Sequence, residues 1–285
     1  MSILQIHAQP SRRTVWILSW FLFATGVVSY FWVSRGRHIE NPDDRVIPTL
    51  RQMGRAFAAA TLKPAEDEEV AGNPDQQSLA TKIRHSMLWK DTMATSRRFL
   101  ISMALLFPAV LLGLHMGMFP YVGSFFLRFV LFFDKIVALS LLPILFIAFG
   151  IDELAKVMLI VVGVAPTIIL DAFNLTRSVP KEQIVKGFTL GAGDFSITYR
   201  IVFKQIWPRV LNSIRLNLKS VMLFLFAGEM IASQDGLAYR IALLRRHMGM
   251  DTIIPYVLWV ALLLFLVDFG MRTLNRKLHP WFQEA

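Results

Sequence analysis

Cysteine is absent from the 285-residue sequence, and charged residues make up only 18% of it. The lack of cysteine excludes disulfide bonds and thiolate chemistry, although it does not identify the compartment. The patterns G-x-x-x-x-G-K-[ST], H-E-x-x-H and G-x-S-x-G, which are typical of nucleotide, zinc and acyl-transfer sites, are also missing. His247 lies in the segment "GLAYRIALLRRHMGM" without neighbouring ligands, which favours a solvated loop over a metal site. We therefore expect no enzyme, no catalytic residue, no metal and no cofactor in this chain.

Because charged residues are few, the sequence contains long apolar runs. The sequence is 55% hydrophobic with a mean hydropathy of +0.50, and residues 15–33 contain no charge, close to the ~20 residues that cross a bilayer. Because a spanning backbone must satisfy its own hydrogen bonds, the sequence predicts an all-α membrane protein with six transmembrane helices. The six predicted spans are residues 15–33, 99–114, 125–150, 154–170, 216–232 and 253–270.

The first apolar run has the basic residues of a signal peptide in front of it, Arg12 and Arg13. It is longer than the typical hydrophobic region of a cleaved signal, and the following "SRGRH" lacks a small-x-small cleavage site. The sequence favours a retained signal anchor.

Basic residues exceed acidic ones by 30 to 20, giving a net charge of +10 and a pI near 10.1. Nucleic acid would explain this balance in a soluble protein, but here the basic residues gather beside apolar runs, where the positive-inside tendency explains them. Six spans place the N-terminus, the loop before residue 216 and the C-terminus on one side, predicted to be cytoplasmic. Arg245, Arg246 and the mixed charges of residues 35–98 fall on the other side and oppose this assignment.

The largest non-membrane stretch, residues 34–98, contains the acidic insertion "KPAEDEEVAGNPDQQS" at residues 63–78. This composition cannot bury enough apolar surface to fold alone, so a solvated loop is expected. Helices are predicted on either side of it, at residues 47–60 and 79–98. The chain is thus divided into an N-terminal part, residues 1–98, and a core, residues 99–285.

Three charged residues lie inside predicted spans. Asp134 and Lys135 are adjacent in the third span, and Glu229 lies deep in the fifth. A charge at bilayer depth costs ~2.5–3.5 kcal/mol on insertion scales and usually faces a bundle interior or a pathway. Asp134, Lys135 and Glu229 are therefore candidate pathway residues, although the first two are equally consistent with a position near the membrane surface.

A polar module, "VPKEQIVKGFTLGAGDFSITYRIVFKQIWP" at residues 179–208, separates two apolar runs. Pro180 begins a predicted helix, Gly191 and its neighbours end it, and Asp194 is expected to cap a second helix. In the second helix an apolar face is predicted from helical spacing; it consists of Phe195, Tyr199, Val202 and Ile206. A short helix on a glycine corner suits docking into a groove of a partner, and an amphipathic element resting on lipid headgroups is the alternative.

These residues resemble permease subunits of type I ABC importers of the nitrate, taurine, sulfonate and bicarbonate class. Their loop reads V-P-x-E-x-x-E-A-A-x-x-L-G-A before an aromatic helix ending in proline; the matching residues are Val179, Pro180, Glu182, Leu190, Gly191, Ala192 and Pro208. "LLPILFIAFGIDELAKV", "DTMATSRRFLIS", "AGEMIASQDGLAYRI" and "LNRKLHPW" are similar to other family segments, so the likeness covers residues 91–281. The Glu-Ala-Ala of the loop is Val185-Lys186-Gly187 here, so the loop departs from the family pattern at these three positions.

The resemblance implies a permease in a bacterial inner membrane, with both termini cytoplasmic. Its expected partners are a second permease copy forming a homodimer, two cytoplasmic ATPases that carry ATP and Mg, a periplasmic solute-binding protein and the lipid bilayer. The solute would be small and anionic, such as a sulfonate, nitrate or bicarbonate. The alternative is a non-transporting membrane scaffold or sensor that retains the fold. Expected ATPase-docking residues in the coupling helix are Glu182, Ile184, Val185, Lys186, Gly187, Phe188, Gly191 and Ala192.

Overall fold

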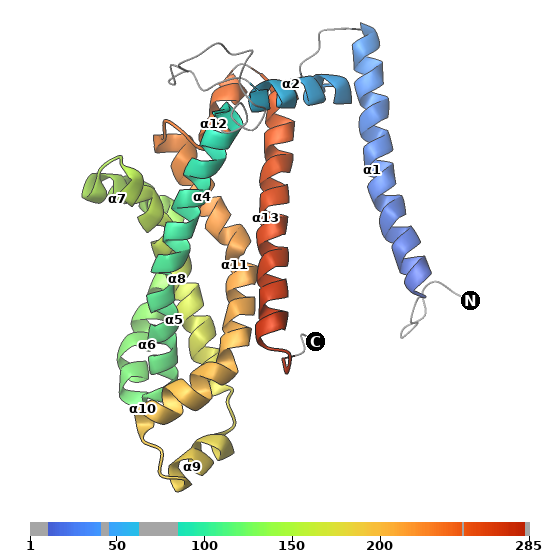
Figure 1. Ribbon diagram of the computed structural model, residues 1–285. Helices are drawn as coiled ribbons and strands as arrows, with labels where there is room; N and C mark the ends of the chain where they lie inside the picture. Colours follow the sequence, from blue (N-terminus) through green and yellow to red (C-terminus); the bar gives the residue numbers. More distant parts are fainter. Residues whose placement is uncertain (1–10, 41–45, 63–84, 247, 283–285) are drawn as a thin grey trace. The chain divides into compact units, whose positions relative to one another are not determined.

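The computed structural model describes residues 11–40, 46–62, 85–246 and 248–282, and the acidic insertion at residues 63–78 lies outside them. The regular elements in these ranges are helices (Figure 1), as the sequence predicts. The chain divides into two compact units, residues 1–59 with 244–255 and residues 60–243 with 256–285.

The first unit contains α1 Arg12–Glu40 and the start of α2 Leu50–Leu62. Residues 13–39 of α1 are long and apolar enough to cross a membrane. The start of α2 is a capping box, because Thr49 accepts a hydrogen bond from the Gln52 amide while the Gln52 side chain accepts one from the Thr49 amide. The helix predicted at residues 47–60 is thereby confirmed, with its start three residues later.

The core of the second unit is built around α8 Glu153–Arg177, which packs against α5 Phe107–Met118 and α11 Phe203–Ala232 (Figure 1). Small residues allow α5 and α8 to approach closely. A Cβ on Gly113 would lie 2.4 Å from the Ile169 carbonyl oxygen, and one on Gly117 would lie 2.5 Å from the Thr176 Cβ. This spacing of four residues places both glycines on one face of α5, as in membrane helix pairs that meet backbone to backbone.

The second predicted span begins earlier than the sequence suggested. Helix α4 Met87–Leu105 starts at its N-cap Ser86, whose hydroxyl accepts a hydrogen bond from the Trp89 amide, and α5 continues the same candidate span to Met118. The division drawn between residues 98 and 99 therefore lies inside α4. Arg97 and Arg98 precede the apolar run in the sequence, but Arg98 is only 4% exposed and fully paired, so its charge does not interrupt the helix.

The third predicted span, residues 125–150, is not one straight helix. It consists of α6 Pro120–Asp134, the 3-10 turn η2 Ala138–Leu141 and α7 Leu142–Phe149, with a bend of 86° between the two parts. Pro143 lies in the first turn of α7, where its missing amide hydrogen costs nothing and favours a new helix start. The described chain thus has five helices that fit a membrane span and one bent pair that makes a sixth.

The module at residues 179–208 contains α9 Lys181–Thr189, α10 Asp194–Ser196 and the π-helical turn η3 Ile197–Val202. The predicted second helix does not end at Pro208, because α10, η3 and α11 form one helical stretch from Asp194 to Ala232 with Pro208 inside it. Within the second unit, α9 lies at one end, beyond α8 and α10 (Figure 1). Helices α12 Leu237–Arg246 and α13 Met250–Leu278 complete the chain.

Candidate functional site

The ends of α9 are fixed by backbone geometry. Pro180 is its N-cap with φ −58° and ψ 130°, and Gly191 follows its last turn with φ +81°. The amide of Gly191 donates to the Phe188 carbonyl (2.9 Å), and that of Ala192 donates to the Gly187 carbonyl (3.1 Å). A residue with a side chain resists this positive φ, so the predicted helix and glycine stop are confirmed.

The expected docking residues do not all face outward. Val185 and Phe188 are 58% and 48% exposed, and Leu190, which the sequence analysis did not include, is 79% exposed. Glu182, Lys186 and Gly191 are exposed as well, whereas Ile184 and Ala192 pack against the core.

Gly187 differs most from the predicted docking role, because it is buried against the following helix. A Cβ there would lie 3.1 Å from the Ile201 Cδ1 and 3.2 Å from the Ile197 Cγ1. The close approach that glycine allows at this position is therefore made by the chain's own helix rather than left open for another subunit.

The predicted apolar face of the second helix is also divided. Phe195 is 69% exposed, whereas Val202 and Ile206 are fully buried. The π-helical turn between them adds residues to one turn and rotates the face away from ideal helical spacing. Asp194 was predicted to be the N-cap of this helix, but the N-cap is Gly193, and Asp194 is the first residue of α10.

Asp134 and Lys135 lie at the bend between α6 and α7, and their side chains have different surroundings. The Asp134 side chain is 17% exposed, and its Oδ1 accepts a hydrogen bond from Thr167 Oγ1 of α8 at 3.0 Å. Lys135 is 79% exposed, and its Nζ lies 3.2 Å from the Asp134 Oδ2. Of the two, only Asp134 is tied to the helix bundle.

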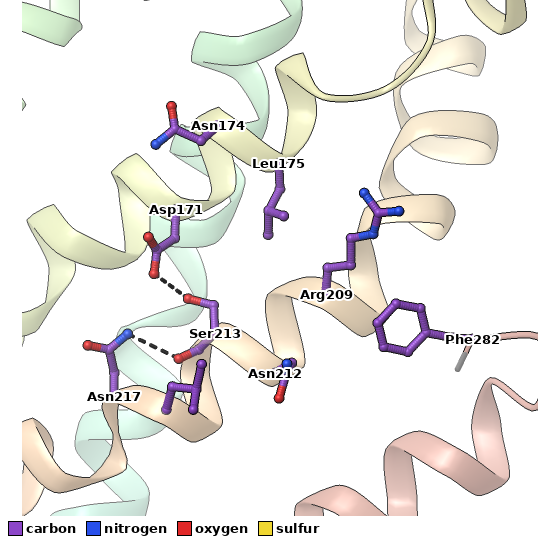
Figure 2. Close-up of a pocket in the computed structure, with 9 residues that line it drawn as sticks. Asp171, Asn174, Leu175, Arg209, Asn212, Ser213, Asn217 and Phe282 are labelled. Carbon is purple, nitrogen blue, oxygen red and sulfur yellow. Dashed lines mark hydrogen bonds between the residues drawn. The ribbon is translucent and has the colours of Figure 1, made fainter. Parts of the chain in front are cut away.

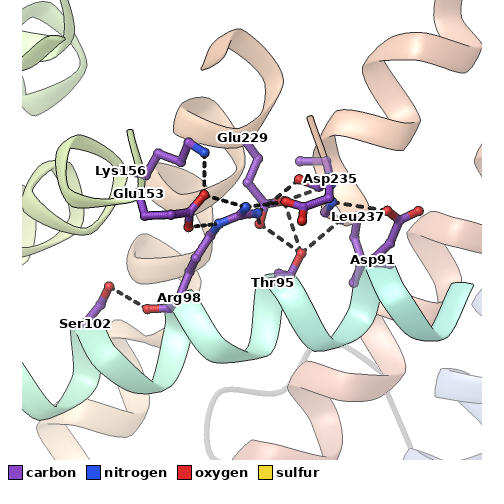
Figure 3. A network of polar contacts seen from close by, with 11 residues as sticks. Asp91, Thr95, Arg98, Ser102, Glu153, Lys156, Glu229, Asp235 and Leu237 are labelled. Atoms are coloured by element: carbon purple, nitrogen blue, oxygen red, sulfur yellow. Dashed lines mark hydrogen bonds and ion pairs between the residues drawn. The ribbon is translucent and has the colours of Figure 1, made fainter. Parts of the chain in front are cut away.

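Glu229 is fully buried near the end of α11 (Figure 3). Its carboxylate accepts hydrogen bonds from Thr95 Oγ1 (2.9 Å), from Arg98 Nη1 (2.8 Å) and from the Ala238 amide (3.1 Å). A buried carboxylate is stable when it is paired and hydrogen-bonded in this way, so the geometry supports a structural role for Glu229.

Arg98 is the centre of this cluster. Besides Glu229, its guanidinium pairs with Glu153 at the start of α8 (Nη2 to Oε1, 2.8 Å) and with Asp235 in the loop after α11. Lys156 Nζ, also nearly buried, contacts the same Glu153 at 2.8 Å. Arg98 thereby joins α4, α8 and α11 at the end of α8 opposite to α9.

A second buried pair lies beside the cluster. Asp91 of α4 is fully buried, with its Oδ2 2.9 Å from the Arg240 Nε and its Oδ1 accepting from the Gly236 amide. Burial lowers the pKa of Arg240, but its hydrogen bond to Asp91 and the charge of that carboxylate outweigh this effect and raise the pKa above its usual value.

This cluster is not evident from the sequence, because residues 34–98 are predicted to be a non-membrane stretch. A helical pattern was nevertheless present, since polar residues follow one face of α4 at intervals of four, three and four. All four members are buried; they are Asp91, Thr95, Arg98 and Ser102.

A polar cavity of about 590 Å³ lies between α8 and α11 (Figure 2). Leu175, Leu216 and Phe282 supply its apolar lining. Its polar lining is Asp171, Asn174, Arg209, Asn212, Ser213 and Asn217. Among the described residues no group of three or more His, Cys, Asp or Glu side chains is placed to hold a metal ion.

Comparison with known proteins gives a family match, several relatives and a solved structure. Residues 109–280 match the family described as "Binding-protein-dependent transport system inner membrane component". The taurine transport system permease protein TauC of Escherichia coli is 27% identical over 202 residues, which cover 70% of this chain and 72% of TauC. The protein named "Putative aliphatic sulfonates transport permease protein SsuC" of the same organism is 24% identical over 143 residues, covering 50% of this chain and 54% of SsuC. A chain of the methionine ABC transporter MetNI in inward-facing conformations is 17% identical with a TM-score of 0.49, covering 65% of this chain and 96% of that one.

Proposed function

Because this chain belongs to the family of binding-protein-dependent transport system inner membrane components, we propose that it forms the solute pathway of an ATP-driven importer. The family match over residues 109–280 is the observation that carries this proposal, since it includes all of α8, α9, α11 and α13. The chain is a multi-pass membrane protein of an ABC permease type, in keeping with its five spanning helices and bent pair.

The proposed solute is a small sulfonate or a similar anion delivered by a periplasmic binding protein. Support comes from the similarity to permeases of taurine and aliphatic sulfonate transport, at 27% and 24% identity. Asp134, Lys135 and Glu229 stay predictions as pathway residues, and of these Glu229 has the surroundings of a structural residue.

The proposed site of ATPase docking is α9 on the cytoplasmic face. Its exposed Val185, Phe188 and Leu190 offer an apolar contact, and the flanking charges of Glu182 and Lys186 would set its register in a cleft. Two permease copies and two ATPases would make one importer, and ATP and Mg would be bound by the ATPases. Movement of the docked α9 would be transmitted directly to α8, which ends a few residues before it.

A membrane scaffold or sensor with the same fold is the second candidate. The observation that favours it is the altered loop, in which Val185, Lys186 and Gly187 replace the Glu-Ala-Ala of similar permeases. A scaffold has no need of an ATPase bound in stoichiometric amount, so the two candidates differ in a measurable property.

The test is co-purification followed by transport. The tagged chain is purified from its own host membrane, its partners are identified by mass spectrometry, and the complex is reconstituted in liposomes with its binding protein. We expect an ATPase at one copy per permease and ATP-dependent uptake of labelled taurine or an alkanesulfonate. Recovery of the chain without an ATPase would refute the importer and support the scaffold. Uptake of cations or sugars alone would refute only the solute class.

A further inference from the structure

The cavity between α8 and α11 is lined by two polar stripes, one on the C-terminal part of α8 and one on the N-terminal part of α11. Arg209, Asn212, Ser213 and Asn217 follow one another at helical spacing on α11, and Asp171 and Asn174 do so on α8. Most of these side chains lie beside the apolar runs at residues 154–170 and 216–232 and not within them. A concave site with a few convergent polar groups is typical of small-ligand binding. Two such stripes facing each other across about 590 Å³ indicate a space that holds a polar solute.

Each charged group of the lining has hydrogen-bonding capacity left. Ser213 donates its hydroxyl hydrogen to the Asp171 Oδ2, which leaves the Oδ1 of that carboxylate as an acceptor. Arg209 has one long contact, 3.5 Å from its Nη1 to the Ser178 Oγ. The remaining guanidinium hydrogens are donors suited to an acid group, because their planar arrangement matches two oxygens at once.

The amides of the lining add donors and acceptors. Arg215 donates two hydrogen bonds, of 2.7 and 3.0 Å, to the Asn212 Oδ1. The Asn212 Nδ2 can therefore donate to a solute. Asn217 donates its Nδ2 to the Ser213 carbonyl and keeps its Oδ1 as an acceptor. Asn174 makes no side-chain hydrogen bond within the part of the chain that the structure describes.

The charges of the lining are one carboxylate and one guanidinium, contributed by different helices (Figure 2). We infer that this cavity is a solute-binding site for a small zwitterion, with Asp171 accepting from an ammonium group and Arg209 donating to the acid group. A simple anion would leave Asp171 facing a like charge, which disfavours binding. This inference rests on the proposed transport function and narrows its solute from an anion to an amino-sulfonate or amino-carboxylate.

Direct binding to the purified full-length chain tests the inference without the binding protein or the ATPase. Three probes of similar size separate the charges: taurine and β-alanine are zwitterions, and isethionate carries the sulfonate of taurine with a hydroxyl in place of the ammonium. In nanodiscs, isothermal titration calorimetry is expected to show saturable binding of both zwitterions. Isethionate is expected to bind at least about tenfold more weakly, because its hydroxyl cannot replace the charge-assisted hydrogen bond from an ammonium group to Asp171.

Two variants assign the two ends of the zwitterion. Asp171→Asn is expected to lower the affinity for taurine and β-alanine by at least about tenfold, while the affinity for isethionate stays the same or rises. Arg209→Gln is expected to lower the affinity for all three probes. Ser213→Ala keeps the Asp171 charge and is expected to keep the preference for zwitterions. Asp152→Asn and Lys219→Gln make the same charge changes at exposed positions outside the cavity and serve as matched controls with native affinity.

Absence of saturable binding by the native chain would overturn the inference, and so would equal affinity for taurine and isethionate that Asp171→Asn does not alter. Sulfonate uptake by the reconstituted complex without binding to the isolated chain refutes the cavity site alone. Asp171-dependent binding of β-alanine without sulfonate uptake supports the cavity site and refutes the proposed sulfonate class.

Discussion

Arg98 illustrates how one side chain organises several helices. It is 4% exposed and faces Glu153, Glu229 and Asp235, each from a different segment. The three carboxylates differ in their surroundings, because Glu229 is fully buried whereas Glu153 and Asp235 are 60% and 40% exposed. Loss of the guanidinium would therefore affect Glu229 most, because its buried carboxylate would be left without a cationic partner.

We predict that Arg98→Ala destabilises the protein by about 3–5 kcal/mol, because removal of one partner from a buried ion pair leaves an uncompensated charge. Thermal unfolding in detergent, followed by loss of monodisperse protein, measures the effect. The double variant Arg98→Ala/Glu229→Ala is expected to recover part of it, since the stranded carboxylate is then gone.

The neighbouring Arg97→Ala is the matched control, because Arg97 is exposed on the same helix turn. Its free energy of unfolding is expected to lie within about 0.5 kcal/mol of that of the native chain. Equal unfolding temperatures for the Arg97 and Arg98 variants would show that the cluster contributes no stability.

At the scale of elements, the contact between α5 and α8 depends on the absence of side chains. The Cβ of an alanine at residue 113 would lie 2.4 Å from the Ile169 carbonyl oxygen, a backbone atom that cannot turn away. Gly113→Ala is therefore predicted to cost about 1–3 kcal/mol by forcing the helices apart, measured as a lower unfolding temperature.

Gly270→Ala in α13 provides the comparison, because nothing lies within 4 Å of the added atom. It is expected to be neutral or slightly stabilising, since alanine favours a helix over glycine by ~1 kcal/mol. A similar loss of stability in both variants would mean that helix contact is not the cause.

Helix α9 gives the next prediction. Phe188→Ala removes an exposed aromatic group from the proposed docking surface and is expected to weaken ATPase binding by about 2 kcal/mol, or roughly thirtyfold. Quantitative pull-down of the ATPase measures this. Phe265→Ala, at an exposed phenylalanine of α13, is expected to bind the ATPase as the native chain does.

The glycine corner after α9 is predicted to be as important as its apolar contact. Gly191→Val places a β-branched residue at φ +81°, a conformation that it resists, so α9 loses its orientation and ATPase binding falls. Gly193→Val is the matched control two residues away, because Gly193 has φ −77° and no atom within 4 Å of an added Cβ. If both valine variants bind the ATPase normally, α9 is not the docking element.

For the whole molecule, six membrane crossings predict that both termini and α9 share the cytoplasmic side. The absence of cysteine makes this measurable, since single cysteines can be introduced and labelled without background. A cysteine at Arg55, an exposed residue between the first two spans, is expected to react with an impermeant maleimide in intact cells, and one at Glu182 only after permeabilisation. Labelling in the opposite order would reverse the proposed orientation, and the unaltered chain controls for non-specific label.

The sequence by itself determined the helical class, the apolar runs and the short helix α9 that stops before Gly191. These features depend on local physics: apolar length sets a span, and only glycine readily adopts the positive φ of that stop. The same local rules failed where packing against other helices determines the backbone path. Apolar length alone predicted a straight third span, and the charge of Arg98 suggested a helix boundary inside what is α4.

Only the tertiary structure decided which polar groups meet. Periodicity places Asp91, Thr95 and Arg98 on one face of a helix, but it does not say that Glu229 lies opposite, 131 residues beyond Arg98. It likewise cannot pair Asp171 of α8 with Ser213 of α11, or turn Gly187 inward against Ile197. A buried charge is tolerated only with its partner, and the partners here come from distant helices whose packing brings them together.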